Sequence, residues 1–144
     1  MLYNYYLKKM KKCPFCNLDK DEILKENKYS VLILAQAPYT KGHLLVIPKR
    51  HVLRLNSLTK KEKDKIEELT YYGIRKLHKK YNNVNILYRE GNKKEIGKSI
   101  NHIHYHLIPE MKIGSNNIKG ETRKIDSHER YLKNIKKIKK ELKI

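Results

Sequence analysis

The sequence predicts an α+β fold in one domain. Four short apolar segments and one long amphipathic segment follow one another as two strands, a helix and two strands, and a basic helix ends the chain. This order lacks the regular strand–helix alternation of a parallel sheet, and it indicates a meander with helices on one face. The 144 residues suit one hydrophobic core, with a basic tail at 1–12, the core at 13–109 and a C-terminal loop and basic helix at 110–144.

The first two strands are predicted at 29–35 and 43–48. Segment 29–35 is almost continuously apolar, which is typical of a strand that is buried on both faces. Pro48 ends the second strand, because proline has no N–H for the ladder. The short turn at 38–42 contains proline and glycine, so we expect the two strands to pair as a hairpin. A further strand is predicted at 84–89.

A long helix is predicted over 59–81. Thr59 is followed three positions later by Glu62, which matches the capping box that satisfies free backbone N–H groups. Gly73 inside the helix costs about 1 kcal/mol relative to alanine, and we expect it to allow the close approach of another backbone. The apolar stripe is wide enough to touch more than one surface: Ile66, Leu69, Tyr72, Gly73, Ile74 and Leu77.

Two other helical segments are expected. One or two turns are predicted within 19–26, with Asp19 or Asp21 as the N-cap. A basic helix is predicted over about 127–142. Its apolar residues fall on one stripe: Tyr131, Ile135, Ile138 and Leu142.

The last predicted strand, 101–109, carries three histidines at alternate positions. Side chains alternate between the two faces of a strand, so His102, His104 and His106 are expected to share one face. Three imidazoles on one face are costly as packing, because each ring has a polar atom that needs a partner. The row therefore indicates a functional face. The other face is apolar and fits a core, with Ile103, Tyr105 and Leu107.

Cys13 and Cys16 are the only cysteines. Their spacing serves either thiol–disulfide exchange or half of a metal site. The exchange reaction is expected within a thioredoxin-like unit of alternating strands and helices, which this sequence lacks, so a metal site is favoured. Histidines are the soft ligands that could complete it, since His51 follows the second strand and His102 begins the last one. The alternative is a catalytic zinc ion held by two histidines of the row and by His43.

The net charge of +19, from 34 basic and 15 acidic residues, would attract polyanions such as nucleic acid. Much of the lysine lies in expected surface helices, and the richness in lysine, asparagine, isoleucine and tyrosine is typical of A/T-rich codons. We therefore favour compositional drift over a dedicated nucleic-acid surface. The sequence has no apolar run long enough for a membrane-spanning helix and no secretory signal, which predicts a cytoplasmic protein without a membrane partner.

Segment 91–99 comes close to the P-loop motif of ATPases. Gly91 and Gly97 are separated by one residue more than the motif allows, and the segment leads into a strand, not a helix. An ATPase is therefore excluded. Gly97, Lys98 and Ser99 can still offer backbone amides, an ammonium group and a hydroxyl to a phosphate beside the histidine face.

The histidine row resembles the signature of the histidine-triad (HIT) family of nucleotidyl hydrolases and transferases, in which three histidines alternate with apolar residues. Segment 41–51 resembles the block around the second strand of that family, and the resemblance covers about 13–109. It implies an antiparallel meander sheet with one long helix, a nucleotide substrate and a homodimer built by the long helix and the third strand.

The resemblance also implies the roles of the histidines. His104 would be the nucleophile that attacks the α-phosphorus of a nucleotide conjugate and forms a covalent nucleotidyl-histidine. His106 and His43 would stabilise charge on the phosphate oxygens or move protons. Some branches of the family bind a structural zinc ion through a Cys-x-x-Cys pair, a histidine after the second strand and the first histidine of the triad. The matching residues are Cys13, Cys16, His51 and His102.

The loop before the triad is implied to contact the phosphate, and its residues here are Gly97, Lys98 and Ser99. Arg89 stands where many members have asparagine, and it would help to neutralise the transferred group. Ala35 stands where the family has a ribose-binding acid or amide, with Gln36 next to it as the candidate contact. Two other functions stay open: a nucleotide- or RNA-binding module without catalysis, and the removal of nucleotide adducts from nucleic-acid ends.

Overall fold

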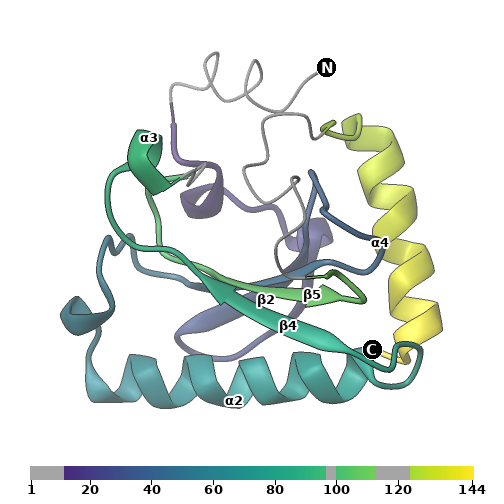
Figure 1. Ribbon diagram of the computed structural model, residues 1–144, viewed down its shortest axis with the longest axis horizontal. Helices are drawn as coiled ribbons and strands as arrows, with labels where there is room; N and C mark the ends of the chain where they lie inside the picture. Colours follow the sequence, from purple (N-terminus) through teal and green to yellow (C-terminus); the bar gives the residue numbers. More distant parts are fainter. Residues whose placement is uncertain (1–11, 97–99, 113–123) are drawn as a thin grey trace.

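The computed structural model describes residues 12–96, 100–112 and 124–144 and contains a five-stranded antiparallel sheet (Figure 1). Its strand order is β1-β2-β3-β5-β4. The predicted α+β class is confirmed, and the predicted hairpin is the antiparallel pair of β2 and β3. The strands are β1 (Ile23–Glu26), β2 (Ser30–Leu34), β3 (Leu44–Pro48), β4 (Val84–Tyr88) and β5 (Tyr105–Pro109).

Strand β1 was not predicted. The helical turns expected within 19–26 are limited to one 3-10 turn, η2 (Lys20–Glu22), in which the Glu22 carboxylate accepts from the Asp19 N–H at 2.8 Å. The chain then pairs with β2, and Leu24 enters the core. Pairing with an open sheet edge outweighs a weak local helix preference. The other short helical segments are η1 (Pro14–Cys16), η3 (Leu55–Ser57) and α3 (Lys93–Ile96).

Helix α2 (Lys60–Leu77) runs along one face of the sheet (Figure 1). The predicted capping box is confirmed, because Thr59 Oγ1 accepts from the Glu62 N–H at 3.2 Å and Glu62 accepts from the Thr59 N–H at 3.0 Å. Gly73 meets side chains and not another backbone, since a Cβ atom there would lie 2.7 Å from Leu107 Cδ1. The predicted stripe is buried at Ile66, Leu69, Gly73 and Leu77.

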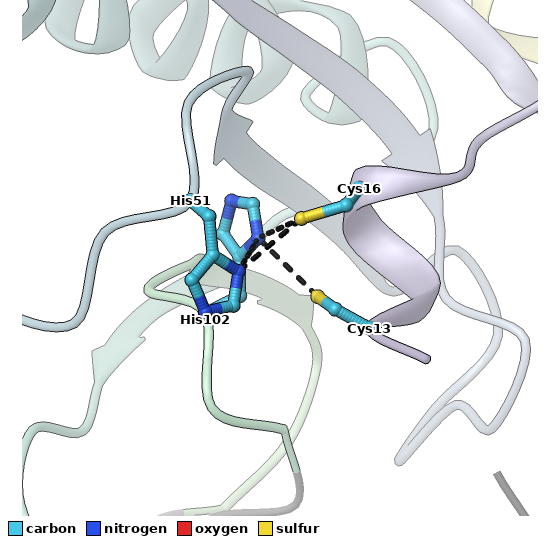
Figure 2. A group of neighbouring side chains, drawn as sticks. All are labelled: Cys13, Cys16, His51 and His102. Carbon is cyan, nitrogen blue, oxygen red and sulfur yellow. Dashed lines mark hydrogen bonds between the residues drawn. The ribbon is translucent and has the colours of Figure 1, made fainter. Parts of the chain in front are cut away.

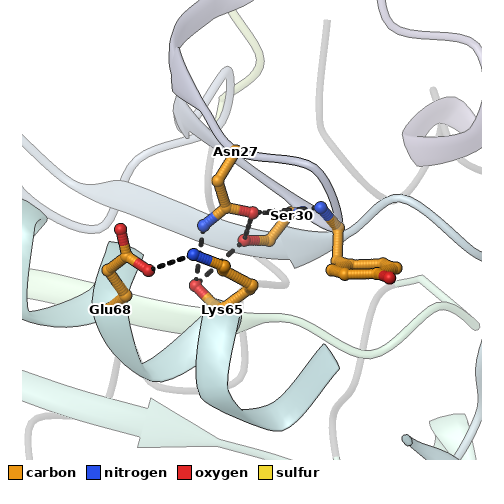
Figure 3. A network of polar contacts seen from close by, with 5 residues as sticks. Asn27, Ser30, Lys65 and Glu68 are labelled. Carbon is orange, nitrogen blue, oxygen red and sulfur yellow. Dashed lines mark hydrogen bonds and ion pairs between the residues drawn. The ribbon is translucent and has the colours of Figure 1, made fainter. Parts of the chain in front are cut away.

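Polar contacts tie the turn between β1 and β2 to α2 (Figure 3). Asn27 Nδ2 donates to the Lys65 carbonyl oxygen at 2.8 Å, and Asn27 Oδ1 accepts from Ser30 Oγ at 2.8 Å. Lys65 Nζ pairs with Glu68 at 2.8 Å. Because Ser30 is buried, these bonds satisfy a hydroxyl that would otherwise destabilise the core. The turn between β1 and β2 is thereby fixed on α2.

Helix α4 (His128–Leu142) lies beside the sheet (Figure 1), and its predicted apolar stripe is buried throughout. Hydrogen bonds tie this C-terminal region to the last residue of β2 and to the loop that follows it. Tyr131 O–H donates to the Leu34 carbonyl oxygen at 2.7 Å, and Gln36 Nε2 donates to the Asp126 carbonyl oxygen at 3.1 Å. The loop that leads from β2 to the second strand of the hairpin is therefore held by the end of the chain.

Buried apolar side chains form two clusters, one on each face of the sheet. Alternate residues of β2 and β3 enter opposite clusters, which confirms the predicted burial on both faces. The first cluster includes α2 and α4, and the second is covered by Phe15 of η1. In the part of the chain that the structure describes, no helix is long and apolar enough to cross a bilayer.

Candidate functional site

Two cysteines and two histidines meet at one point (Figure 2). Cys13 directly precedes η1 and Cys16 ends it, and this short segment is called the N-terminal knuckle. His51 follows β3, and His102 precedes β5. One possible ligand atom from each residue lies within 4.8 Å of the other three. Cys16 Sγ is 3.2 Å from His51 Nδ1, and Cys13 Sγ is 3.4 Å from His102 Nδ1. Two thiols and two imidazoles fit tetrahedral coordination of zinc.

The ring of His102 is oriented for metal binding by the backbone. Its Nε2 lies 2.8 Å from the Pro48 carbonyl oxygen, which can only accept, so we assign the proton to Nε2 and the lone pair to Nδ1. Burial lowers the pKa of His102, which favours the neutral ring that a metal ion requires. A carbonyl behind a ligating histidine is the usual support for such a site.

The loop that carries His51 is anchored to the start of α2. Arg50 Nη2 lies 2.9 Å from Glu62 Oε1, and the same nitrogen donates to the Ser57 carbonyl oxygen at 2.9 Å. The hydrogen bond from Arg50 lowers the pKa of the buried Glu62 carboxyl to about 2, so this carboxylate stays charged. One carboxylate thus caps the helix and positions the segment next to His51, a residue of the cysteine cluster.

The histidine segment is less regular than predicted. Strand β5 begins at Tyr105, so His106 lies in the strand while His102 and His104 lie in the segment before it. The reason is a change of partner, because the Ile103 N–H donates to the Val52 carbonyl oxygen at 2.9 Å, outside the β3–β5 ladder. The three rings do not form a single uniform row, since the first belongs to the cysteine cluster.

His104 has one defined tautomer. Its Nδ1 lies 2.8 Å from the His102 carbonyl oxygen, so Nδ1 carries the proton and Nε2 carries the lone pair in the neutral ring. The side chain is buried, and its ring centre lies 4.6 Å from that of His106. An imidazole held in this way offers a nucleophilic nitrogen with a fixed direction.

His43 and His106 form a hydrogen-bonded pair. The Tyr39 N–H donates to His43 Nδ1 at 3.1 Å, which places the proton of neutral His43 on Nε2. His43 Nε2 then donates to His106 Nδ1 at 2.9 Å, and the proton of neutral His106 is left on its Nε2. The pair can therefore present an N–H donor from His106 beside the lone pair of His104.

Two aromatic residues contact the histidines and were not predicted. Phe15 presents a T-shaped contact to His104 at 5.0 Å and to His102 at 5.8 Å between ring centres. Tyr39 stacks on His43 at 5.5 Å with an angle of 29° between the planes. Their positions in the sequence could have indicated these contacts, since Phe15 lies between the two cysteines and Tyr39 lies in the turn before His43.

The other residues that were predicted to contact the nucleotide lie in different parts of the molecule. Arg89 lies near the histidines, because its guanidinium carbon is 5.9 Å from the Tyr39 ring centre. Gln36 directs its amide to Asp126, and Ala35 is buried in the second apolar cluster. Gly97, Lys98 and Ser99 lie outside the described residues. Among the described residues, a group of three or more metal-ligating side chains is found at the cysteine cluster and not around His43, which does not support the catalytic-zinc alternative.

Fold and site together define a class: α+β proteins in which a meander sheet carries a Cys2His2 cluster next to a set of hydrogen-bonded histidines. The family model described as the HIT domain matches residues 18–113. This chain belongs to the HIT family, as the histidine signature predicted.

Relatives and solved structures agree with this assignment. An uncharacterized HIT-like protein of Methanocaldococcus jannaschii is 31% identical over 140 residues, covering 86% of this chain and 98% of the relative. The adenosine 5'-monophosphoramidase hnt1 of Schizosaccharomyces pombe is 32% identical over 101 residues, covering 67% of this chain and 73% of the relative. The fold of the Plasmodium falciparum diadenosine triphosphate hydrolase superposes with a TM-score of 0.71 at 22% identity, covering 99% of this chain and 97% of that one.

Proposed function

We propose that this protein is a nucleotide hydrolase or nucleotidyltransferase that acts on the α-phosphate of a nucleotide conjugate through a covalent intermediate on His104. The observation that carries the proposal is the pair of opposite tautomers, a lone pair on His104 Nε2 beside an N–H on His106 Nε2. Two kinds of relative, the adenosine 5'-monophosphoramidase of Schizosaccharomyces pombe and the bis(5'-adenosyl)-triphosphatase of Saccharomyces cerevisiae, support phosphorus chemistry of this class.

The proposed reaction has two displacements. His104 Nε2 attacks the α-phosphorus, a P–N bond forms, and the bond to the leaving group breaks with its electron pair going to the leaving group. Water then attacks the same phosphorus, the P–N electron pair returns to Nε2, and the proton of the water is released to solvent. The N–H of His106, aligned by His43, stabilises the negative charge on the phosphate oxygens in both steps.

The substrate contacts follow from the same proposal. Arg89 lies at the edge of the histidine cluster and supplies positive charge. Gln36 is the candidate for the sugar, and its side-chain N–H donates to the Asp126 carbonyl oxygen at 3.1 Å, so a nucleotide would have to compete for that donor. The loop before the triad is proposed to bind the phosphate through Gly97, Lys98 and Ser99.

A structural zinc ion is proposed at the cysteine cluster, with Cys13, Cys16, His51 and His102 as ligands. Both histidines turn Nδ1 toward the thiols, which is the orientation that a shared ion requires. Such an ion would pin the N-terminal knuckle to the segments after β3 and before β5, and its binding free energy would add to the stability of the fold.

A homodimer in a cytoplasmic setting is also proposed. The two most exposed large apolar side chains among the described residues are Ile86 of the edge strand β4, at 54%, and Tyr71 of α2, at 53%. They lie on the two elements that the family resemblance assigns to the dimer interface, and a second copy would cover them. Sedimentation analysis of the wild type and of Ile86→Lys tests this, since a monomeric wild type would contradict it.

The proposed function is tested with a panel of diadenosine polyphosphates, adenosine phosphoramidate and adenylated DNA, each with and without added phosphate. We expect turnover of at least one nucleotide conjugate, and phosphate-dependent products would identify a phosphorylase. Mass spectrometry after an alkaline quench should detect one nucleotidyl group on the peptide that contains His104. His78→Ala is the matched control, because His78 is exposed and away from the site. Turnover in His104→Ala equal to wild type would overturn the proposal.

The second candidate, action on or binding to nucleic acid, rests on the net charge of +19. It predicts binding of single-stranded oligonucleotides whose affinity falls steeply as salt rises. Cleavage of an adenylated DNA end, but of no free nucleotide conjugate, would favour this candidate over the first. Weak binding of the oligonucleotides at moderate salt would mean that the positive charge reflects the amino-acid composition and not a nucleic-acid site.

A further inference from the structure

A fixed positive charge stands at one end of the catalytic cluster. The guanidinium carbon of Arg89 lies 5.9 Å from the centre of the Tyr39 ring, and that ring stacks on His43 and contacts His106 at 6.2 Å. Arg89 directly follows β4, while Tyr39 belongs to the loop before His43. Two segments far apart in the sequence therefore place a cation beside the histidines.

The position of this charge differs from that of the nucleophile. The ring of His104 contacts those of Phe15 and His106, while the Tyr39 ring contacts those of His43 and His106. Arg89 is thus joined through Tyr39 to the pair of His43 and His106. We infer that its charge serves negative charge next to the phosphorus that His104 attacks.

The chemistry of arginine suits such a position. A guanidinium held over the face of an aromatic ring by a cation–π contact can direct its planar set of N–H donors to an anion. Those donors match two oxygens of one phosphate, which lysine, with a compact and strongly hydrated charge, matches less well. The Tyr39 ring thus orients the guanidinium for a phosphate.

We propose that Arg89, positioned by Tyr39, is a specificity-determining residue that selects substrates with a second phosphate next to the one attacked. The favoured substrate class is a dinucleoside polyphosphate, over a phosphoramidate that has a single phosphate. This inference rests on the proposed function. When the bond breaks, a polyphosphate leaving group takes the electron pair onto its own oxygens, whereas the nitrogen of a phosphoramidate leaves as an uncharged amine once protonated by solvent.

The test compares kcat/KM for diadenosine tetraphosphate and adenosine 5'-phosphoramidate. We expect Arg89→Gln to lower the ratio of the two values about tenfold, as the loss of a hydrogen-bonded ion pair does. Arg75→Gln is the matched control, because Arg75 is exposed on α2 and its loss changes the net charge equally. Arg89→Lys should give an intermediate ratio. Equal losses for both substrates, or the same change in the control, would overturn the proposal.

Tyr39 is tested by the same ratio. Tyr39→Phe keeps the ring and should keep the ratio, while Tyr39→Leu removes the cation–π contact with Arg89 and should lower the ratio about threefold. A ratio in Tyr39→Leu that equals the ratio of Tyr39→Phe contradicts the positioning role, whatever the absolute rates are.

A binding measurement separates this inference from the proposed function. Calorimetry with inorganic tripolyphosphate and with inorganic phosphate is carried out on His104→Ala combined with Arg89→Gln or with Arg75→Gln. We expect tripolyphosphate to bind about tenfold more weakly when Arg89 is lost, and the affinity for inorganic phosphate to change less than about threefold. If the wild type cleaves no nucleotide conjugate, the proposed function fails, and this comparison still decides the role of Arg89. Equal tripolyphosphate affinities overturn it.

Discussion

His102 and His104 lie two positions apart, yet each ring directs the nitrogen that carries its lone pair to different residues. His102 donates from Nε2 to the Pro48 carbonyl and turns Nδ1 toward two thiols and a second imidazole. His104 donates from Nδ1 to the His102 carbonyl and keeps its lone pair on Nε2, next to His106. One ring belongs to the cluster of two cysteines and two histidines, and the other to the group of hydrogen-bonded histidines.

The difference lies in the backbone carbonyls and not in the residue type. A neutral imidazole has one N–H and one lone pair, so the acceptor that holds the N–H decides which nitrogen is offered and in which direction. Two carbonyl oxygens, each 2.8 Å from its ring, divide the histidine segment into two ends. The end at His102, proposed to hold zinc, is called the metal end, and the end at His104 and His106, proposed to carry the reaction, is called the catalytic end. Phe15 lies between them, since its ring contacts both histidines.

The largest expected effect separates the two ends directly. His104→Ala should lower kcat on the order of 10³-fold or more, because it removes the nucleophile, and should leave the metal content and the melting temperature near wild type. His102→Ala should lose metal and stability together with activity. A melting curve of His102→Ala that matches wild type would erase the distinction between the two ends.

Removal of the proposed zinc ion should lower the thermal stability of the protein. A chelator, or Cys16→Ser, should lower the melting temperature by at least about 10 °C, since the ion connects three segments of the chain. Purified wild-type protein, prepared without chelators, should contain about one equivalent of zinc per chain. A metal content below about a tenth of an equivalent, with the same melting curve, would contradict a structural zinc ion.

Phe15 should transmit a smaller effect from the metal end to the catalytic end. Phe15→Leu keeps an apolar side chain but loses the edge contact with His104, so we expect kcat to fall about threefold to tenfold while KM changes little. Ile33→Val is the control, because Ile33 lies in the same apolar cluster. A similar loss of kcat in the control would assign the effect to general loosening of that cluster.

The smallest effect is expected from Glu62, which supports the metal end through Arg50. Glu62→Gln should lower the unfolding free energy at pH 7 by about 1–2 kcal/mol, because the guanidinium is half exposed and solvent weakens the pair. The pKa of Glu62 is lowered to about 2, below its unfolded value of about 4.3. The stabilisation is therefore complete above about pH 5 and is lost as the pH falls toward 2.

Chemical denaturation of wild type and Glu62→Gln between pH 7 and pH 2 checks this prediction. The gap in unfolding free energy should close as the pH falls, while kcat at pH 7 stays close to wild type. A gap that is constant over the whole range would mean that the carboxylate charge contributes nothing to stability.

Features with local causes were predicted correctly from the sequence. The capping box at Thr59 and Glu62 needs only the spacing of two side chains, and the stripes of α2 and α4 need only the helical period. The cluster of Cys13, Cys16, His51 and His102 was predicted through family resemblance, because spacing alone left the choice of histidines open. The structure confirms the capping box, the buried stripes and the meeting of these four residues, and their role as zinc ligands stays a prediction.

Other features that depend on distant partners, and that no family resemblance indicated, were missed. Strand β1 exists because β2 offers it a free edge, and β5 starts late because the Ile103 N–H is bound by Val52. The contacts of Tyr39 and Phe15 join segments whose proximity only the folded sheet defines. No local pattern carries the positions of such partners.

The hydrogen bonds that join the C-terminal region to the end of β2 and the loop after it have a consequence for the order of folding. The Tyr131 hydroxyl reaches the Leu34 carbonyl across 97 positions of the chain, and contacts so distant in sequence close large loops at an entropic cost and form slowly. The segment that delivers His43 is thus completed late. After dilution from denaturant, far-UV ellipticity should recover before turnover does, and simultaneous recovery would refute this order. The maturation of activity would then be timed by the docking of the last helix.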